Sequence, residues 1–152
     1  MVSKVSQRPP KHPVRQFSIF TDNRVGRLHS LIESMATHEI HIMALSQLDT
    51  SECNVVRCIV DYHENARDLL TECGYSFVET EVIAIEIESE SQLRFVTAAL
   101  VEAEINIHYL YPFLARPSGK SGIALHLEDN GLAVSVLNAH NIKVLDQNDI
   151  AR

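Results

Sequence analysis

The chain contains 152 residues, of which 45% are hydrophobic and 22% charged, as in a globular protein of one medium domain or two small ones. Its net charge of −7 argues against nucleic acid as a partner, because contact with phosphates requires a basic excess. No long apolar run occurs, so we expect neither a signal peptide nor a transmembrane helix. The cysteines, Cys53, Cys58 and Cys73, lack metal-ligand spacing and predict reduced thiols in a cytoplasmic protein.

Residues 1–15 differ in composition from the rest of the chain. They hold four basic residues, three prolines and no acidic residue, and they show no hydrophobic period. This composition predicts a disordered basic arm. A tether for an acidic partner or for nucleic acid is the functional alternative, but four charges over fifteen residues are a weak signal for one.

The remaining residues contain an internal repeat. An offset of 65 residues aligns Leu28 with Leu93 and the segment 39–42 with 104–107. Further along, an offset of 67 aligns Leu70 with Leu137, and a two-residue insertion near 117–120 explains the change. Because the chain is duplicated, its fold follows from the fold of one unit.

The first unit alternates between strand and helix patterns. Leu28, Leu31, Ile32 and Met35 have the spacing of one helical face, and the β-branched run that includes Val55 and Val56 favours a strand. Ala66, Leu69 and Leu70 predict a second helix, which Gly74 ends, and Cys73 falls on its apolar face, where we expect it to be buried. The expected strands are 16–22, 42–49, 54–61 and 76–81, and the expected helices are 27–38 and 64–73.

The second unit repeats this order of elements. Its expected strands are 82–88, 107–115, 122–128 and 142–145, and its expected helices are 92–103 and 131–140. The pattern predicts an α+β protein of two ferredoxin-like βαββαβ units, 16–81 and 82–148. In each, two helices cover one face of a four-stranded antiparallel sheet. Units this small are marginal alone, and the junction lacks a linker, so we expect them to pack tightly on each other.

The turn after the first strand carries the sequence Asp22-Asn23-Arg24-Val25-Gly26-Arg27-Leu28, and the second unit carries Ile105-Asn106-Ile107 at the entry to its second strand. Over 16–148 these stretches resemble a tandem pair of ACT domains, the small ligand-binding module of amino-acid metabolism. That family shows an acidic or Asn residue followed by Pro-Gly-x-Leu after its first strand, and Asn-Ile-x before its second. Val25 departs from the pattern, because it stands where the family usually has proline.

The resemblance implies a non-catalytic regulatory protein that binds an amino acid or a related metabolite between two such units. The loop after the first strand of one unit would face the corner between first helix and second strand of its neighbour. No cofactor, metal or catalytic residue is implied. The expected ligand-binding residues are Asp22, Asn23, Arg24, Val25, Gly26, Arg27, Leu28, Asn106 and Ile107.

The residue types fit an amino-acid ligand on physical grounds. Gly26 lacks a Cβ and precedes a helix whose free N–H groups favour a carboxylate, which Arg24 and Arg27 would reinforce. Asp22 suits the α-ammonium group, and Asn106 offers both a donor and an acceptor. Each residue also has an ordinary explanation, because acidic, amide and glycine residues are common in turns and arginines are commonly solvated.

The two loops are not equivalent. Ser91 stands at the position of Gly26, Glu88 and Glu90 would repel a carboxylate, and His41 stands at the position of Asn106. The sequence therefore predicts one competent composite site, from 22–28 with Asn106, and one degenerate site, from 88–92 with His41.

Other functions find less support in the sequence. The histidine pairs His38/His41 and His108/His126 form no closed ligand set, and no nucleophile motif or phosphate-binding glycine loop occurs. Acylphosphatase-type enzymes share this topology but need an arginine in a glycine-rich loop. RNA-recognition modules need aromatic residues on the central strands. The main alternative is a protein that acts through protein–protein contacts without a ligand, and we expect a homodimer and a regulated enzyme as partners in either case.

Overall fold

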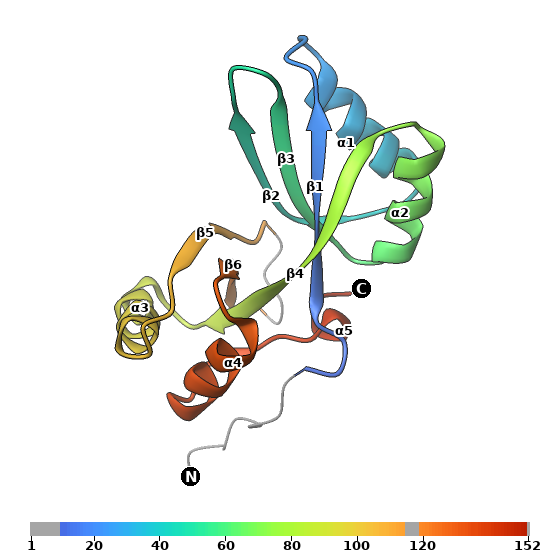
Figure 1. Cartoon of the computed structure of the whole chain (residues 1–152). Helices are drawn as coiled ribbons and strands as arrows, with labels where there is room; N and C mark the ends of the chain where they lie inside the picture. The colour runs from blue at the N-terminus through green and yellow to red at the C-terminus, as the bar shows by residue number, and fades with distance from the viewer. Residues whose placement is uncertain (1–9, 115–118, 152) are drawn as a thin grey trace. The chain divides into compact units, whose positions relative to one another are not determined.

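The computed structural model describes residues 10–114 and 119–151, and these residues divide into two compact units. The N-terminal unit is Arg15–Glu81, and the C-terminal unit is Val82–Ile150 together with the described residues up to Val14. Each unit is described by itself below, in the labels of Figure 1.

The N-terminal unit is a four-stranded antiparallel sheet with two helices on one face (Figure 1). The strand order is β2-β3-β1-β4, and the pairing Phe17↔Cys58 sets the register of the two central strands. Its elements are β1 Val14–Thr21, α1 Arg27–Thr37, β2 Ile42–Asp49, β3 Asn54–Val60, α2 His63–Glu72 and the first half of β4 Ser76–Ile87.

The C-terminal unit repeats this arrangement. The second half of β4 lies between β6 and β7, since Ile85 pairs with Ile123 on one side and with Val144 on the other, and β5 lies beyond β6. Its further elements are the 3-10 turn η1 Glu90–Gln92, α3 Leu93–Glu102, β5 Ile107–Pro112, β6 Ser121–Leu127, α4 Asn130–Ala139, β7 Lys143–Val144 and α5 Gln147–Ile150. The α+β class and the ferredoxin-like topology predicted from the sequence are thereby confirmed.

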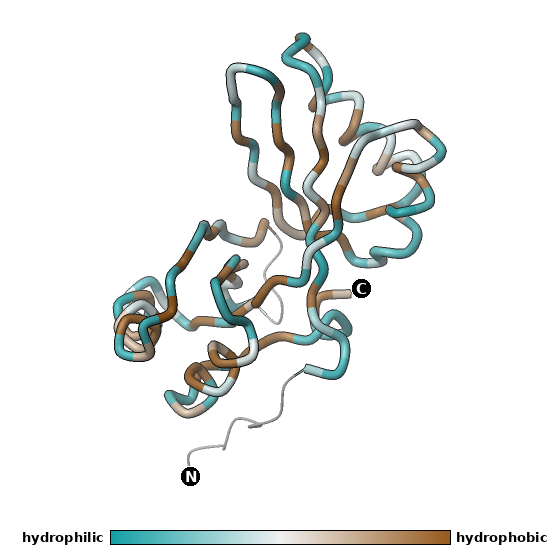
Figure 2. The backbone as a smooth tube through the Cα atoms, in the orientation of Figure 1, coloured by the Kyte–Doolittle hydropathy of each residue, from teal (hydrophilic) through white to brown (hydrophobic). Residues whose placement is uncertain are grey.

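Each unit buries its own hydrophobic core between sheet and helices. The N-terminal core includes Phe17 and Ile19 of β1 with Met35 of α1 and Leu70 of α2, and the C-terminal core includes Leu100 of α3. Hydrophobic residues alternate along the strands, whereas the turn between β1 and α1 is mostly hydrophilic (Figure 2). The periodic residues of the sequence therefore form the cores, and the polar turns lie at the ends of the sheets.

All four long helices end in the same way. After α2, Gly74 adopts a left-handed conformation (φ 75°), its N–H bonds Thr71 O, and the N–H of Tyr75 bonds Leu70 O. This double contact satisfies carbonyl groups that the helix end would leave free. The other three helices make the equivalent contacts through Glu39, Glu104 and Asn141, each with positive φ, followed by a buried isoleucine at 40, 105 and 142.

Several boundaries differ from the expected ones. The strands predicted at 76–81 and 82–88 form one continuous strand, β4. The junction, Thr80-Glu81-Val82, contains no glycine, proline or other turn residue that would end the strand. The strand predicted at 107–115 ends at Pro112, and residues 115–118 lie outside the described part of the chain. The sequence pattern also missed α5, since a single helical turn carries no measurable period.

The predicted disordered arm extends too far. Residues 1–9 lie outside the described part of the chain, but β1 already begins at Val14, which is buried. Within the C-terminal unit, the backbone of His12 donates to Asp146 Oδ2 (2.8 Å) and accepts from the N–H of Gln147 (2.7 Å). These long-range bonds hold His12, and β1 includes Val14 and Arg15; local composition gives no sign of either arrangement.

Candidate functional site

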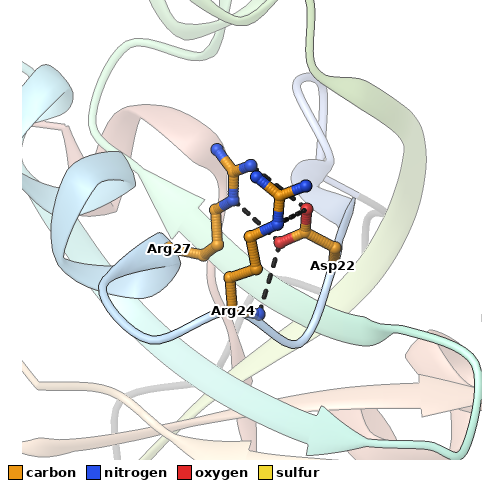
Figure 3. A network of polar contacts seen from close by, with 3 residues as sticks. All are labelled: Asp22, Arg24 and Arg27. Carbon is orange, nitrogen blue, oxygen red and sulfur yellow. Dashed lines mark hydrogen bonds and ion pairs between the residues drawn. The ribbon is translucent and has the colours of Figure 1, made fainter.

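The turn between β1 and α1 brings three of the predicted site residues into one ion-pair network (Figure 3). Asp22 Oδ1 accepts from Arg27 Nε at 2.8 Å, and Oδ2 accepts from Arg27 Nη2 at 3.1 Å. Arg24 adds its backbone N–H to Oδ1 (3.3 Å) and its Nε lies 3.4 Å from Oδ2. Both guanidinium groups therefore face one carboxylate.

The network changes the proton affinity of its members while they stay in contact with solvent. The hydrogen bond from Arg27 is the main cause that holds the pKa of Asp22 below its usual value, and the same bond raises the pKa of Arg27. About half of each of the two side chains is exposed, at 47% for Asp22 and 43% for Arg27. The charges are accordingly permanent near neutral pH and accessible to a small solute.

Gly26, the N-cap residue of α1, has a backbone conformation that favours glycine. Its φ of 91° and ψ of −4° lie in the left-handed region, and no heavy atom lies within 4 Å of a Cβ built there. The glycine therefore serves the turn geometry and leaves open space in front of the helix. No side chain caps α1, and the Arg27 N–H donates to Arg24 O at 3.4 Å, so the N–H groups that a ligand can reach are the next ones of the first turn.

A pocket of about 360 Å³ opens beside this turn, entirely within the N-terminal unit. It is formed where the end of β1 and the start of α1 meet the turn between α2 and β4, which the strand order places next to β1. Burial is the main cause that raises the pKa of Tyr75 in its wall. The lining residues are Phe20, Thr21, Asp22, Arg27, Ser34, Cys73, Gly74, Tyr75 and Ser76.

Sequence reasoning missed the half of this pocket that comes from 73–76. The signal was present, because the βαββαβ topology pairs β4 with β1 and so places the turn before β4 beside the turn after β1. Cys73 also contradicts its expected burial. It is the C-cap residue of α2 and is exposed, because Leu70 is the last buried residue of the helix and Thr71 and Glu72 are already exposed.

The other predicted residues of this turn have mixed surroundings. Asn23 donates from Nδ2 to Thr50 O at 3.4 Å, which holds the turn against the hairpin between β2 and β3. Val25 is fully exposed, whereas Leu28 packs against the N-terminal core. Leu28 thus anchors α1, and Val25 is free of contacts that would restrict the turn.

Asn106 and Ile107 lie at the corner between α3 and β5 in the C-terminal unit. Ile107 packs against the core, and the backbone of Asn106 pairs with Glu128, donating to Oε2 (3.3 Å) and accepting from its N–H (3.1 Å). The Asn106 side chain is exposed. Its amide is thus presented at a corner whose backbone is fixed.

The repeat-related corner of the N-terminal unit carries a histidine–aspartate pair. His41 Nδ1 lies 2.7 Å from Asp61 Oδ2, and Asp61 Oδ1 accepts from the N–H groups of His41 (3.0 Å) and Tyr62 (2.9 Å). The Asp61 side chain is buried, while 55% of the His41 side chain is exposed. The carboxylate is therefore a structural anchor that orients the imidazole.

The loop between β4 and α3 differs from the turn at Gly26. It forms the 3-10 turn η1 before α3, and the Glu88 N–H donates to Gln92 Oε1 at 2.6 Å. Ser91, at the position of Gly26, lies inside that turn and contacts Ser89. This loop therefore lacks the position without a side chain that Gly26 provides in front of α1.

Metal-binding clusters and membrane-spanning helices are both absent from the described residues. Within 10–114 and 119–151, no three His, Cys, Asp or Glu side chains gather closely enough to hold a metal ion. Over the same residues, no helix has the length and apolar character needed to cross a membrane.

The sequence profile described as an ACT domain pair matches residues 12–152. The chain is an ACT domain pair. The resemblance read from 22–28 and 105–107 is thereby confirmed. No curated protein matches this chain.

Solved structures share the fold of this ACT domain pair. A protein from Bacteroides thetaiotaomicron has a TM-score of 0.83 at 23% identity, over 92% of this chain and 96% of the other. The ligand-free regulatory subunit of aspartate kinase from Thermus thermophilus has a TM-score of 0.59 at 12% identity, over 85% and 91%. The corresponding subunit from Thermus flavus has a TM-score of 0.54 at 12% identity, over 91% and 98%.

Proposed function

We propose that this ACT domain pair is a non-catalytic regulatory protein that binds an amino acid or a related small zwitterion at the turn 22–28. The observation that carries the proposal is the juxtaposition of the Asp22 carboxylate, two arginines and an uncapped helix start within one open turn. These groups supply both of the charges that an α-amino acid requires.

Binding proceeds by exchange of ion-pair partners. The ligand carboxylate takes the N–H groups of α1 that follow Arg27 in the first turn, and the guanidinium of Arg24, whose side chain is 76% exposed and whose ion pair is the longer one. The ligand ammonium takes the Asp22 oxygen that this exchange releases. Arg27 keeps its two bonds and holds Asp22 in place. The adjacent pocket, with Tyr75 and Ser34, receives the ligand side chain.

A corner of a neighbouring ACT unit completes the site, and Asn106 with Ile107 is the better suited of the two corners. An amide can donate to the ligand carboxylate and accept from its ammonium at the same time. His41 is oriented by Asp61 and offers one ring nitrogen, so it satisfies only one of these needs.

Regulation then acts through another chain. Two of the solved structures with this fold are regulatory subunits of aspartate kinase, and that architecture is a reason to place this protein beside an enzyme that it controls. We place this pair in the cytoplasm and expect it to form a homodimer. A ligand shifts the regulated state only by the difference in its affinity for the two arrangements.

A thermal shift assay with each of the twenty amino acids tests the proposal. A ligand at 100-fold above its dissociation constant adds about 2.7 kcal/mol to the free energy of unfolding. Asp22→Asn and Gly26→Asp should abolish the shift, whereas Asp68→Asn, an exposed charge change on α2, should retain it. Absence of any shift, together with capture of a stable partner chain, would favour the alternative of a protein that works by contacts alone.

A further inference from the structure

The C-terminal unit contains a pocket at the position that the repeat relates to the pocket beside Asp22. The offset of 65 residues takes Arg27 to Gln92, and the later offset of 67 takes Gly74 to Asn141. This pocket has a volume of about 270 Å³. Its lining residues are Glu86, Glu88, Gln92, Lys120, Asn141, Ile142 and Lys143.

Glu86 is the buried charge of this pocket. Only 7% of its side chain is exposed, and the amines nearest to it are Lys143 Nζ at 3.5 Å from Oε2 and Lys120 Nζ at 3.8 Å from Oε1. Direct charge-assisted hydrogen bonds are shorter, at about 2.7–2.9 Å. The lysines therefore compensate the charge of Glu86 from a distance and leave room beside its oxygens.

One of the lysines also contacts the second carboxylate of the pocket, Glu88. Lys120 Nζ lies 3.4 Å from Glu88 Oε1 as well, so it lies between the two carboxylates. The repulsion expected of Glu88 toward a ligand carboxylate is therefore offset by Lys120, which precedes β6, while Lys143 of β7 compensates Glu86. The pocket thus holds two negative and two positive groups, of which the lysines are about half exposed.

We infer that this pocket is a second site for a small zwitterion, which binds with its ammonium on Glu86 and its carboxylate between Lys120 and Lys143. A simple anion would lie against the buried carboxylate, and a simple cation would lie against two ammonium groups. A ligand that carries both charges pairs with both and lets each lysine shorten its contact. The volume suits a molecule smaller than the drug-sized ligands of typical 300–1,000 Å³ pockets, roughly the size of an amino acid.

The inference stands apart from the function proposed for 22–28, because none of those residues lines this pocket. The two pockets also differ in chemistry. A tyrosine and an arginine line the N-terminal one, where Ile142 and Gln92 stand in the C-terminal one. The two sites are therefore expected to prefer different amino acids.

Two-dimensional NMR of the full ¹⁵N-labelled chain, titrated with each of the twenty amino acids, tests the second site. We expect at least one amino acid to shift the amide signals of Gln92, Asn141 and Lys143 in a saturable way. Its carboxamide and N-acetyl derivatives, which lack one charge each, should fail to do so. Shifts at 22–28 report on the other site in the same spectra, so either site can fail without the other.

Lys143→Met and Glu86→Gln should each weaken binding at this pocket roughly tenfold or more, as expected for loss of a charge-assisted hydrogen bond. The matched controls Lys11→Met and Glu52→Gln change exposed charges that do not line the pocket and should bind as the wild type does. Lys143 is an exposed side chain, so this variant remains informative if Glu86→Gln unfolds. Unchanged affinity in Lys143→Met, equal binding of an uncharged derivative, or no shift of these amides with any amino acid would overturn the inference.

Discussion

Asp22 and Arg27 form a two-point contact across the turn between β1 and α1, with Nε–Oδ1 at 2.8 Å and Nη2–Oδ2 at 3.1 Å. The planar guanidinium matches the carboxylate in both oxygens, so the pair fixes the direction of Asp22 in a way that a lysine would not. The turn therefore presents a carboxylate held in place, next to a second, looser arginine.

The first prediction concerns this pair. In Arg27→Gln the pKa of Asp22 should rise toward its ordinary value of 3.8, because Arg27 supplies the largest of the effects that lower it. Arg24→Gln should raise it less, since the Arg24 side chain is more exposed and its contact longer. A carboxyl-selective NMR titration measures both values, and an equal rise in the two variants would contradict the ranking.

The second prediction concerns two glycines that both have room for a Cβ but differ in backbone conformation. Gly26→Ala should destabilise the chain by roughly 1–2 kcal/mol, because its φ of 91° is unfavourable for a residue with a Cβ although the space is open. Gly131→Ala in α4 should stabilise by about 0.5–1 kcal/mol, since its nearest neighbour, Asp129 Oδ1, lies at an ordinary 3.6 Å. Urea denaturation measures both changes, and a loss of stability in Gly131→Ala would refute this view of α4.

The third prediction concerns thiol reactivity. Burial raises the pKa of Cys58 to about 12, so in the native protein its thiol should resist alkylation at pH 8. Cys73 is exposed at the end of α2 and should be modified first. Mass spectrometry after a brief iodoacetamide pulse distinguishes the sites. Modification of Cys58 at the rate of Cys73 would show that the N-terminal core opens readily.

The fourth prediction concerns acid stability. Arg67 of α2 holds Glu79 of β4 by two bonds, Nε–Oε2 at 2.6 Å and Nη2–Oε1 at 2.8 Å, and this hydrogen bonding is the main cause that lowers the pKa of Glu79. A lowered folded-state pKa contributes stability that is complete above the ordinary value of 4.5 and is lost as the pH falls through the folded-state value.

The Glu79→Gln variant should therefore lose less stability than the wild type as the pH falls below 4.5. Arg67→Met, which removes the partner of Glu79, should also lose less. Thermal denaturation between neutral pH and pH 3 compares the variants with the wild type. If both variants retain the full acid dependence, the pair has no role in it.

The repeated fold was predictable because its signals are local. The helical spacing of Leu28, Leu31 and Met35 and the β-branched run of β3 lie in contiguous residues, and duplication made each unit a check on the other. The family followed from Gly26 and Asn106 in their repeated context. The exposure of Cys73 and the order in residues 12–15 were not predictable in this way, because both depend on where an element ends against distant residues.

The candidate sites show the same division. The sequence alone determined which turn carries Asp22, Arg24, Arg27 and Gly26, since all four lie within one short segment. Only the tertiary structure decided which charges meet, because strand pairing brings β7 beside β4 and the turn 73–76 beside β1. Through that pairing Lys143 reaches Glu86, and an acidic loop that looked repulsive in the linear sequence becomes a pocket with both charges.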